Sequence, residues 1–528
     1  ANCRGAAAIL MKRNELILAV SGVALLAWGA LWIERARGPM RDVMLDGGPA
    51  CPAAPATILE PSNQAPRGAV VVFHGLGANR IVMLTTGQQF AAAGFRVYLV
   101  DSPGHGADTA PFSFAANEAC ARGLLGTLER TGAISARRTV LLGHSMGAAL
   151  VVRLADRFPA AATIAVSTAP LVPPRRIPSN LLLVAPQFDM PPVLAAERHL
   201  AAAAGAERTA PEDFRELRAF RLLSVPWRTH TGALFDASAT RTMLRWALDA
   251  VGAGAAAAPR PDFRPFYGGW LGLLGILLIF PAAASGAAQL TRIRALRIGS
   301  APPRPAMTIL AWTAATILAA ILLVHWVPLA ALHLYSAGYL ASLLLLAGLP
   351  LSLAYGIGEA RRAREQRAQS PSRSWKDSLS ETLCGAILGM ASILAAGAWL
   401  NWQLTEAWPV AARWQRFPFL VAALFPACLA EEYALGDPRA LRRLGRAARM
   451  ALFIVLRAIV WLVLLVATWS GAADALLSVI FVAFLGALSL GQRLGADALR
   501  HRTGSAVAAA VFGAILAAWF LAAAFPLA

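Results

Sequence analysis

The sequence predicts an α/β domain with a mostly parallel sheet and helices on both faces, joined to a polytopic α-helical membrane domain. Two observations support this prediction. Between residues 41 and 258, short β-rich runs alternate with helical stretches, which is typical of a parallel sheet. From residue 259 to residue 528, long apolar runs dominate, each near the ~20 residues that a helix needs to cross the hydrocarbon core. With one further run near the N-terminus, we expect about nine transmembrane helices in total.

The composition also indicates a membrane protein. Of the 528 residues, 57% are hydrophobic and 15% are charged, whereas soluble domains average about 25% charged residues. The net charge of +19 could indicate a nucleic-acid partner, but the arginines fall in short clusters between apolar runs, where membrane topology places them. The five cysteines are scattered without a C-x-x-C pair. We therefore expect a lipid bilayer as partner, and no nucleic acid, metal or cofactor.

The first 40 residues are predicted to be an N-terminal extension followed by a signal-anchor helix. Residues 17–33 form an apolar run of about a span's length, and no small-residue cleavage site clearly follows it. Met11 is a candidate for the natural start, which would make residues 1–10 an upstream extension.

The membrane domain, residues 259–528, contains about eight further apolar segments. They are residues 266–288, 306–326, 329–356, 381–403, 417–433, 450–469, 473–490 and 505–526. Cationic residues gather in every second loop between these segments. They are Arg292, Arg294, Arg297, Arg304, Arg361, Arg362, Arg364, Arg367, Arg373, Lys376, Arg439, Arg442, Arg443, Arg446, Arg449, Arg493, Arg500 and Arg502. The opposite loops hold only Arg413 and Arg416, so the positive-inside rule places residues 41–258 outside the cytoplasm.

Within residues 41–258, the motif Gly143-His144-Ser145-Met146-Gly147 follows a β-rich run and precedes a helical stretch from Ala148. A strand–turn–helix with small flanking residues is what a nucleophile elbow requires, because the tight turn lifts the serine hydroxyl above the sheet. The sequence therefore predicts Ser145 as a nucleophile, with Gly143 and Gly147 as the supporting glycines. Other buried-strand runs are predicted at 69–73, 95–100, 162–166 and 181–185.

A nucleophilic serine needs a base, and the base needs an acid to orient it. In this kind of fold the acid and the base follow the serine in that order, in loops after later strands. Asp189 ends the run 181–188, and His230 follows the run 222–227. We therefore predict Asp189 as the acid and His230 as the base. The alternatives are His199 for the base, and Asp213 or Asp236 for the acid.

An oxyanion hole needs backbone N–H donors aimed at the developing charge. The expected donors are Met146, just after the nucleophile, and Leu76, just after His74-Gly75. His74 and His105, the latter in Asp101-Ser-Pro-Gly-His-Gly, are expected to support these loops by hydrogen bonding rather than to take part in the chemistry.

These residues carry a family resemblance. His74-Gly75, the Asp101 to Gly106 motif, Gly143-His-Ser-Met-Gly, Asp189 and His230 resemble the α/β-hydrolase superfamily, most closely its monoacylglycerol-lipase and serine-aminopeptidase-like branch. The resemblance covers about residues 41–255 and implies hydrolysis of a carboxylic ester or related acyl group through an acyl-enzyme. Many relatives insert a helical lid after the sixth strand, but here only residues 170–179 separate that strand from the next. An open pocket is therefore expected.

The predicted function is that of a membrane-bound serine hydrolase acting on an ester, thioester or amide of a lipid-like or cell-envelope substrate. The hydrolase domain would face the periplasm or the extracellular side of the inner membrane of a bacterium. Two alternatives remain. The same triad could serve an acyltransferase, or the domain could be a non-catalytic sensor that regulates the membrane half.

Two pairs of residues remain open at this stage. Cys51 and Cys120 either form a disulfide, as an oxidising compartment would permit, or are separate buried thiols. Glu431 and Glu432 are functional candidates if buried within the membrane. The preferred interpretation is that both reach the interface beside Arg439 and Arg442.

Overall fold

The computed structural model describes most of the chain from residue 13 to residue 528. The residues not described within this range are 50, 63, 172–173, 292–304, 327–329, 367–374, 437–444, 473–474, 476 and 479–481. The predicted start at Met11 lies outside the described residues. The same holds for Arg292, Arg294, Arg297, Arg304, Arg367, Arg373, Arg439, Arg442 and Arg443.

The chain forms two compact units, called here the sheet unit and the helical unit. The sheet unit comprises Trp28–Trp270, Trp399–Val410 and Pro526–Ala528, and the helical unit comprises the rest up to Phe525. The sequence assigned all residues from 259 onward to the membrane domain. The sheet unit also contains residues 259–270, 399–410 and 526–528, which lie beyond the predicted boundary at 258. Of these, Leu527 donates to the carbonyl of Gly104 and accepts from the N–H of Phe112.

The sheet has eight strands in the order β1-β2-β4-β3-β5-β6-β7-β8. The strands are β1 (Met40–Leu45), β2 (Ala54–Leu59), β3 (Ala69–Phe73), β4 (Arg96–Val100), β5 (Thr139–His144), β6 (Ala162–Val166), β7 (Leu181–Phe188) and β8 (Phe220–Thr229). β1 pairs antiparallel with β2, and β2 pairs antiparallel with β4. All the other pairs are parallel. The prediction of a mostly parallel sheet is therefore confirmed, with the antiparallel β1–β2 hairpin at one edge added to it.

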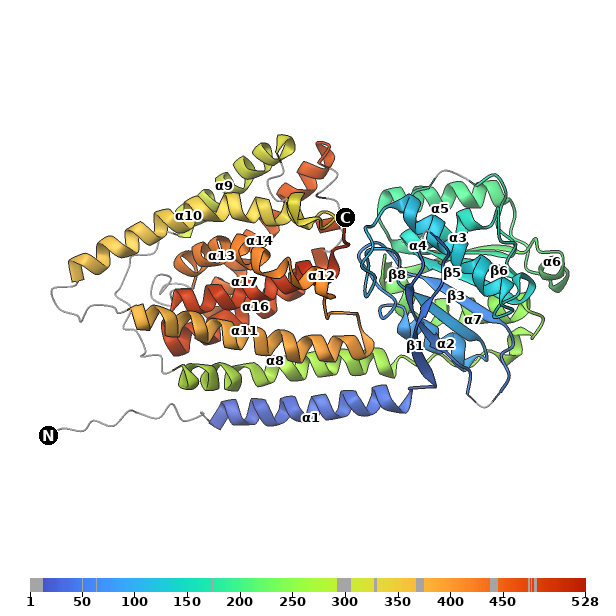
Figure 1. Ribbon diagram of the computed structural model, residues 1–528, viewed down its shortest axis with the longest axis horizontal. Coiled ribbons are helices and arrows are strands. Elements are labelled where there is room, and N and C mark those ends of the chain that lie inside the picture. The colour runs from blue at the N-terminus through green and yellow to red at the C-terminus, as the bar shows by residue number, and fades with distance from the viewer. Residues whose placement is uncertain are drawn as a thin grey trace. The chain divides into compact units, whose positions relative to one another are not determined.

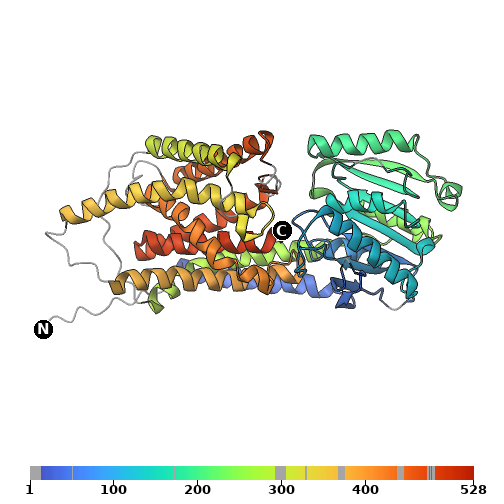
Figure 2. The same ribbon diagram turned by 45° about the horizontal axis from the view of Figure 1, so that its top comes forward.

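Helices cover both faces of this sheet (Figures 1 and 2). They are α2 (Leu84–Ala92), α3 (Phe114–Arg130), α4 (Met146–Leu154), α5 (Pro191–Ala204), α6 (Pro211–Arg215) and α7 (Ala237–Ala250). In strand β3, alternate side chains point to opposite faces of the sheet and pack in different cores. Its Val70 and Val72 belong to the core formed with α2 and α7, whereas Val71 and Phe73 belong to the core formed with α3 and α4.

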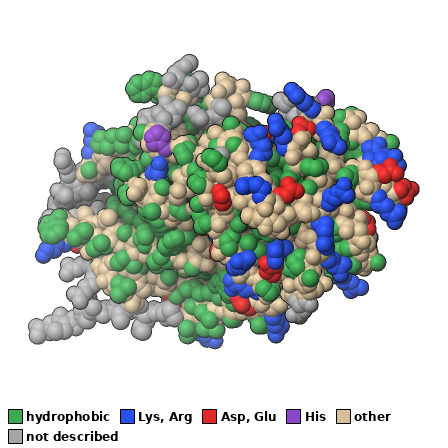
Figure 3. All heavy atoms as spheres, turned by 45° about the vertical axis from the view of Figure 1, so that its right-hand side comes forward, with side chains coloured by type: hydrophobic (Ala, Val, Ile, Leu, Met, Phe, Trp, Pro, Cys, Tyr) green, Lys and Arg blue, Asp and Glu red, His purple; other side chains and the backbone are tan. Residues whose placement is uncertain are grey.

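The helical unit is built from long apolar helices. The helices that run through or into it are α1 (Arg13–Arg35), α8 (Arg264–Leu290), α9 (Pro305–His325), α10 (Ala337–Gln366), α11 (Trp375–Gln403), α12 (Ala411–Trp414), α13 (Phe417–Ala434), α14 (Arg446–Trp469), α16 (Val482–Thr503) and α17 (Ala506–Ala524). Among the described residues, seven helices are long and apolar enough to cross a membrane, and α9 contains a shorter apolar stretch, Met307–Leu323. Figure 3 shows hydrophobic side chains gathered over the helices, and acidic and basic ones mixed over the sheet unit. These features are compatible with a membrane domain.

The last cationic stretch of the sequence is helical, and the predicted span beside it stays a prediction. The sequence placed a span at 473–490 and a cationic loop after it, but α16 continues to Thr503 and contains Arg493, Arg500 and Arg502. One of these cations has an acidic partner on a neighbouring helix. Arg493 pairs with the carboxylate of Glu432, and both side chains are buried.

The two glutamates are buried among the helices; Arg439 and Arg442 lie outside the described residues, so an interfacial position beside them stays a prediction. Glu431 is only 5% exposed and Glu432 only 3% exposed. Glu431 accepts a hydrogen bond from Arg457 of α14 at 2.9 Å, and Glu432 pairs with Arg493 of α16. A buried carboxylate requires a nearby cation, and the neighbouring helices supply both.

Candidate active site

Ser145 lies at a sharp turn between β5 and α4. Its backbone has φ +55° and ψ −114°, a region that residues other than glycine rarely adopt. The surroundings hold it there: the N–H of Ser145 donates to the carbonyl of Val166 at 2.9 Å, and its own carbonyl accepts from Ala149 and Ala169. The side chain is half-buried. This strained strand–turn–helix has the geometry of a nucleophile elbow.

The two glycines of the motif are required by close approach of backbone segments. A Cβ atom on Gly147 would overlap the carbonyl oxygen of Phe73 at the end of β3. A Cβ atom on Gly143 would overlap the carbonyl oxygen of Gly147 across the turn. The motif glycines therefore allow the turn to fit against the neighbouring strand.

Asp189 and His230 meet at the same edge of the sheet. Asp189 follows β7 and His230 follows β8, and these strands are parallel neighbours, so their carboxyl ends lie side by side. The distance between Asp189 Oδ1 and His230 Nδ1 is 2.7 Å. The Asp189 carboxylate is fully buried and also accepts from the N–H of Met190 at 2.7 Å. This contact fixes which ring nitrogen of His230 carries the proton, leaving Nε2 as the one that can act as a base.

The backbone of His230 is held beside the elbow. Its carbonyl accepts from the Ser167 hydroxyl at 2.8 Å and from His144 Nε2 at 3.2 Å. The rings of His144 and His230 lie 5.0 Å apart. Burial lowers the pKa of His144 to about 3, so this ring stays neutral. Within the described part of the chain, no hydrogen bond joins the Ser145 hydroxyl to His230. Such contacts are commonly loose in the free enzyme and tighten with substrate.

Among the described residues, the alternative candidates make no hydrogen bond or ion pair with Ser145, Asp189 or His230. His199 is exposed on α5. Asp213 accepts from the N–H of Ala210 and pairs with Arg218. Asp236 caps α7 through the N–H groups of Ser238 and Ala239, and it also pairs with Arg228. Of the three candidate acids, Asp189 is the one that contacts His230.

The loop after β3 lies directly against the elbow. A Cβ atom on Gly75 would be 3.1 Å from Ser145 Cβ and 3.1 Å from His144 Nδ1, so this position has almost no room for a side chain. Leu76 is the next residue in this loop, and Met146 is the first residue of α4. That their N–H groups stabilise an oxyanion stays a prediction.

His74 connects two loops around the site. Its Nδ1 donates to the carbonyl of Gly75 at 2.8 Å, and its Nε2 accepts from the N–H of Ser102 at 3.0 Å. Burial lowers its pKa, so the ring stays neutral. His105 Nδ1 lies 2.9 Å from the carbonyl of Pro103. Both histidines therefore hold loops, as the sequence suggested.

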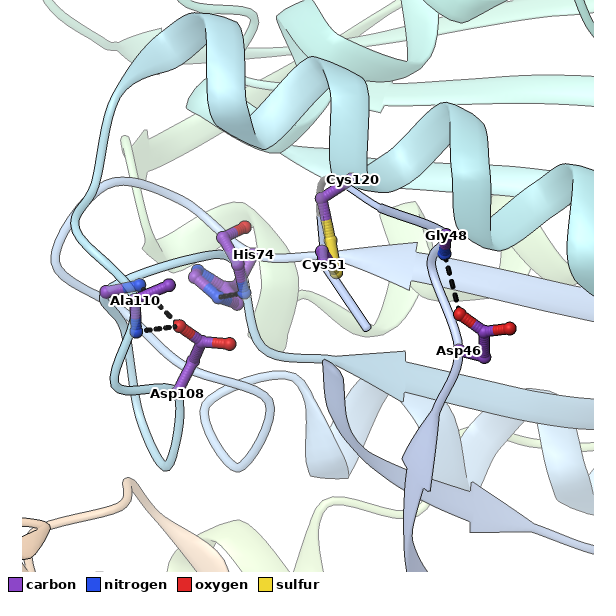
Figure 4. Close-up of a disulfide and its surroundings, with 9 residues drawn as sticks. Asp46, Gly48, Cys51, His74, Asp108, Ala110 and Cys120 are labelled. Atoms are coloured by element: carbon purple, nitrogen blue, oxygen red, sulfur yellow. Dashed lines mark hydrogen bonds between the residues drawn. A yellow bond between two sulfur atoms is a disulfide. The ribbon is translucent and has the colours of Figure 1, made fainter. Parts of the chain in front are cut away.

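Cys51 and Cys120 form a disulfide in the same unit (Figure 4). The bond joins the loop before β2 to α3, and the two Cα atoms are 5.1 Å apart. Of the two sequence-based alternatives, the disulfide is the one that the structure contains. Among the described residues, no group of three or more His, Cys, Asp or Glu side chains is placed to hold a metal ion.

Comparison with known families finds one match within the sheet unit. Residues 64–203 match the family described as serine aminopeptidase, S33. The sheet unit has the α/β-hydrolase fold. The match begins before β3, includes Ser145 and Asp189, and ends within α5.

Solved structures of α/β hydrolases are also similar to this chain. A Thermus thermophilus protein is 18% identical, with a TM-score of 0.31, over 41% of this chain and 98% of its own. An esterase from Pyrobaculum calidifontis is 13% identical, with a TM-score of 0.32, over 48% of this chain and 97% of its own. A lidless serine hydrolase from Xanthomonas campestris is 16% identical, with a TM-score of 0.31, over 40% of this chain and 94% of its own. No curated protein matches the chain.

One residue of the hydrolase site was missed by sequence reasoning. Glu197 of α5 is 1% exposed, and its Oε1 accepts from the N–H of Thr168 at 3.0 Å. Thr168 follows Ser167, whose hydroxyl holds the His230 carbonyl. Glu197 therefore steadies the loop that supports His230. The signal was present in the sequence, because Glu197 shares one helical face with Val193, Leu200 and Ala204.

Burial, together with the nearby charge of Asp189, raises the pKa of Glu197 to about 8. In an unfolded chain this carboxyl would titrate near 4.3. Between these two pH values the folded protein binds a proton at Glu197 that the unfolded chain releases. The free energy of unfolding therefore falls as the pH rises, by at most about 1.4 kcal/mol per pH unit from this group.

Glu197→Gln is accordingly expected to flatten the pH dependence of stability and to raise stability near pH 8. Glutamine keeps the carbonyl acceptor for Thr168 and cannot ionise. The measurement is the Tm of the purified full-length protein from pH 5 to pH 9. The exposed Glu212, changed to Gln, is the control and should leave the pH slope unchanged. An unchanged slope in Glu197→Gln would show that Glu197 is ionised throughout this range.

Proposed function

We propose that this chain is a membrane-bound serine hydrolase that cleaves an acyl ester of a lipid-like or cell-envelope substrate through an acyl-enzyme. The observation that carries the proposal is the 2.7 Å contact between Asp189 and His230 beside the strained turn at Ser145. An activated serine needs a base, an acid that fixes the base, and an exposed hydroxyl, and these three groups meet that need.

The proposed reaction has two halves. His230 Nε2 takes the proton of the Ser145 hydroxyl as Oγ forms a bond to the ester carbonyl carbon. The N–H groups of Leu76 and Met146 bind the resulting oxyanion. His230 then gives its proton to the leaving alkoxide as the ester C–O bond breaks. Water, deprotonated by His230, attacks the acyl-enzyme in the same way, which releases the carboxylic acid and restores Ser145.

Apolar surface near the site favours an acyl chain as part of the substrate. A cavity of ≈ 330 Å³ is lined mainly by apolar side chains from the loop after β6 and from α5, with His199 among them. Pro170 of that loop follows Ala169, whose N–H contacts the Ser145 carbonyl. Beside the acid and the base, Phe188 and Trp227 form an edge-to-face pair and are 53% and 77% exposed. No helix occurs among the described residues between β6 and β7, which favours open access.

The membrane location and its orientation are part of the same proposal. Seven helices of the described chain are long and apolar enough to span a bilayer, and cationic residues favour one set of loops. The Cys51–Cys120 disulfide is of the kind that persists in oxidising compartments. We therefore place the hydrolase on the periplasmic or extracellular side of the inner membrane.

The proposal is tested by covalent labelling of the purified full-length protein with a fluorophosphonate. We expect the native protein to be labelled and the heat-denatured protein to remain unlabelled. The adduct should lie on the tryptic peptide 139–153, in which Ser145 is the single serine. With p-nitrophenyl esters, kcat/KM should rise from the acetate to the octanoate. A folded protein that neither reacts with the probe nor hydrolyses any of these esters would overturn the proposal.

A further inference from the structure

A segment remote in the sequence binds the loop that follows β3. Residues 399–410, which comprise the end of α11 and the segment that leads to α12, belong to the sheet unit. They contact Asn79 and Arg80, more than three hundred positions earlier in the sequence. Asn79 and Arg80 end the loop that begins at Gly75 and contains Leu76, where an oxyanion donor is expected.

The side chain of Asn79 is occupied by the remote segment. Its Nδ2 donates to the Thr405 hydroxyl at 2.9 Å, and its Oδ1 accepts from the N–H of Glu406 at 2.9 Å. The same Oδ1 also accepts from the N–H of Ile81 at 3.1 Å. Asn79 is 2% exposed. Among the described residues, the amide nitrogen of Asn79 thus donates to the remote segment alone, whereas the amide oxygen accepts from both that segment and Ile81.

Arg80 is held by carboxylates from both segments. Its guanidinium pairs with Asp101, which follows β4, and with Glu406. The Arg80 side chain is 9% exposed, that of Asp101 is fully buried, and that of Glu406 is 14% exposed. Asp42 of β1 approaches the guanidinium to 3.9 Å, and Thr57 accepts from Arg80 Nε at 3.1 Å. Burial and the charge of Asp101 raise the pKa of Glu406, so its charge depends on Arg80.

These contacts lead back to the nucleophile through a short stretch of chain. The N–H of Arg80 donates to Asp101 Oδ1 at 2.7 Å, and the N–H of Ala78 donates to the carbonyl of Gly75 at 3.1 Å. Gly75 in turn lies against Ser145. The loop is therefore fixed at Gly75 by the elbow and at residues 79–80 by Asp101, Thr405 and Glu406. Displacement of one end would move the Leu76 N–H that lies between them.

We propose that Thr405 and Glu406 are positioning residues of the hydrolase, which hold the loop of Gly75 to Arg80 in the geometry that binds the oxyanion. This inference rests on the proposed serine-hydrolase function. It gives a physical reason for the hydrolase and the apolar helices to share one chain, because the residues that complete the loop come from between α11 and α13. The hydrolase region alone, residues 41–258, would lack them.

The test compares Glu406→Gln and Thr405→Val with wild type in the full-length protein. We expect kcat for p-nitrophenyl ester hydrolysis to fall roughly tenfold to a hundredfold, below the full effect of deleting an oxyanion donor. KM should change less than twofold. Affinity for an alkyl boronic acid, which forms a tetrahedral adduct with the serine, should fall by the same factor as kcat. If Thr405 and Glu406 acted only on stability, kcat and the affinity for the boronic acid would not fall by the same factor while KM stayed unchanged.

Glu60→Gln is the matched control. It removes the 2.9 Å ion pair between Glu60 and Arg96, which lies in the same unit and does not touch the loop. Its kcat should stay within twofold of wild type. If Glu406→Gln proves unstable, the test is made with Thr405→Val, which removes a single hydrogen bond. An active wild type with both variants behaving like Glu60→Gln would overturn this inference alone. An inactive and unlabelled wild type would overturn the proposed function and this inference together.

Discussion

Asp189→Asn is expected to lower kcat for ester hydrolysis by about four orders of magnitude, with little change in folding. Asparagine has nearly the same shape as aspartate, so β7 and β8 should pack as before. Its amide can present an N–H to His230 Nδ1, however, and that contact favours the tautomer whose Nε2 already carries a proton. Such a ring cannot accept the proton of Ser145. Asparagine also lacks the negative charge that stabilises the imidazolium.

The measurement is single-turnover phosphonylation of Ser145 together with steady-state ester hydrolysis. Asp236→Asn is the control, because asparagine caps a helix about as well as aspartate does and should preserve α7. Its activity should remain within about threefold of wild type. If Asp236→Asn were the inactive variant and Asp189→Asn retained activity, the acid would have been assigned to the wrong strand end.

The parts of the site that sequence predicts are those fixed by strand order. Strands β3, β4, β5 and β6 are short continuous apolar runs, because each is buried on both faces, and such runs are readily recognised. Asp189 and His230 follow β7 and β8, where parallel strands end at a common edge. Their meeting therefore follows from topology, and it needs no knowledge of side-chain packing.

The parts that were missed depend on packing between remote segments. Strand β2 contains Pro55 and small residues and reads as a loop, although all of its residues are buried. The pairing of Glu432 with Arg493 could not be found from loop charges, because Arg493 lies within a helix. Nor does any local pattern relate Asn79 to Thr405. Only the folded chain places these groups within hydrogen-bonding distance.

Gly147→Ala is expected to disrupt the elbow and to abolish labelling of Ser145. The added Cβ would overlap the carbonyl oxygen of Phe73, a backbone atom of β3 that cannot move aside as a flexible side chain can. Relief requires a shift of α4 away from β3, and Ser145 and the Gly75 loop lie on either side of that contact. Overpacking of this kind costs about 3 kcal/mol or more, because backbone rather than side chain must yield.

The measurements are the Tm and the rate of phosphonylation of the purified full-length variant. Gly126→Ala is the matched control, since a Cβ at that position in α3 meets nothing within 4 Å. Alanine at an unstrained helix position should stabilise the protein by up to about 1 kcal/mol. Opposite changes in Tm from the same chemical substitution would show that the effect at Gly147 arises from the contact with β3. Wild-type labelling of Gly147→Ala would mean that the elbow tolerates a wider turn than the structure allows, and the predicted effect of the contact with β3 would be wrong.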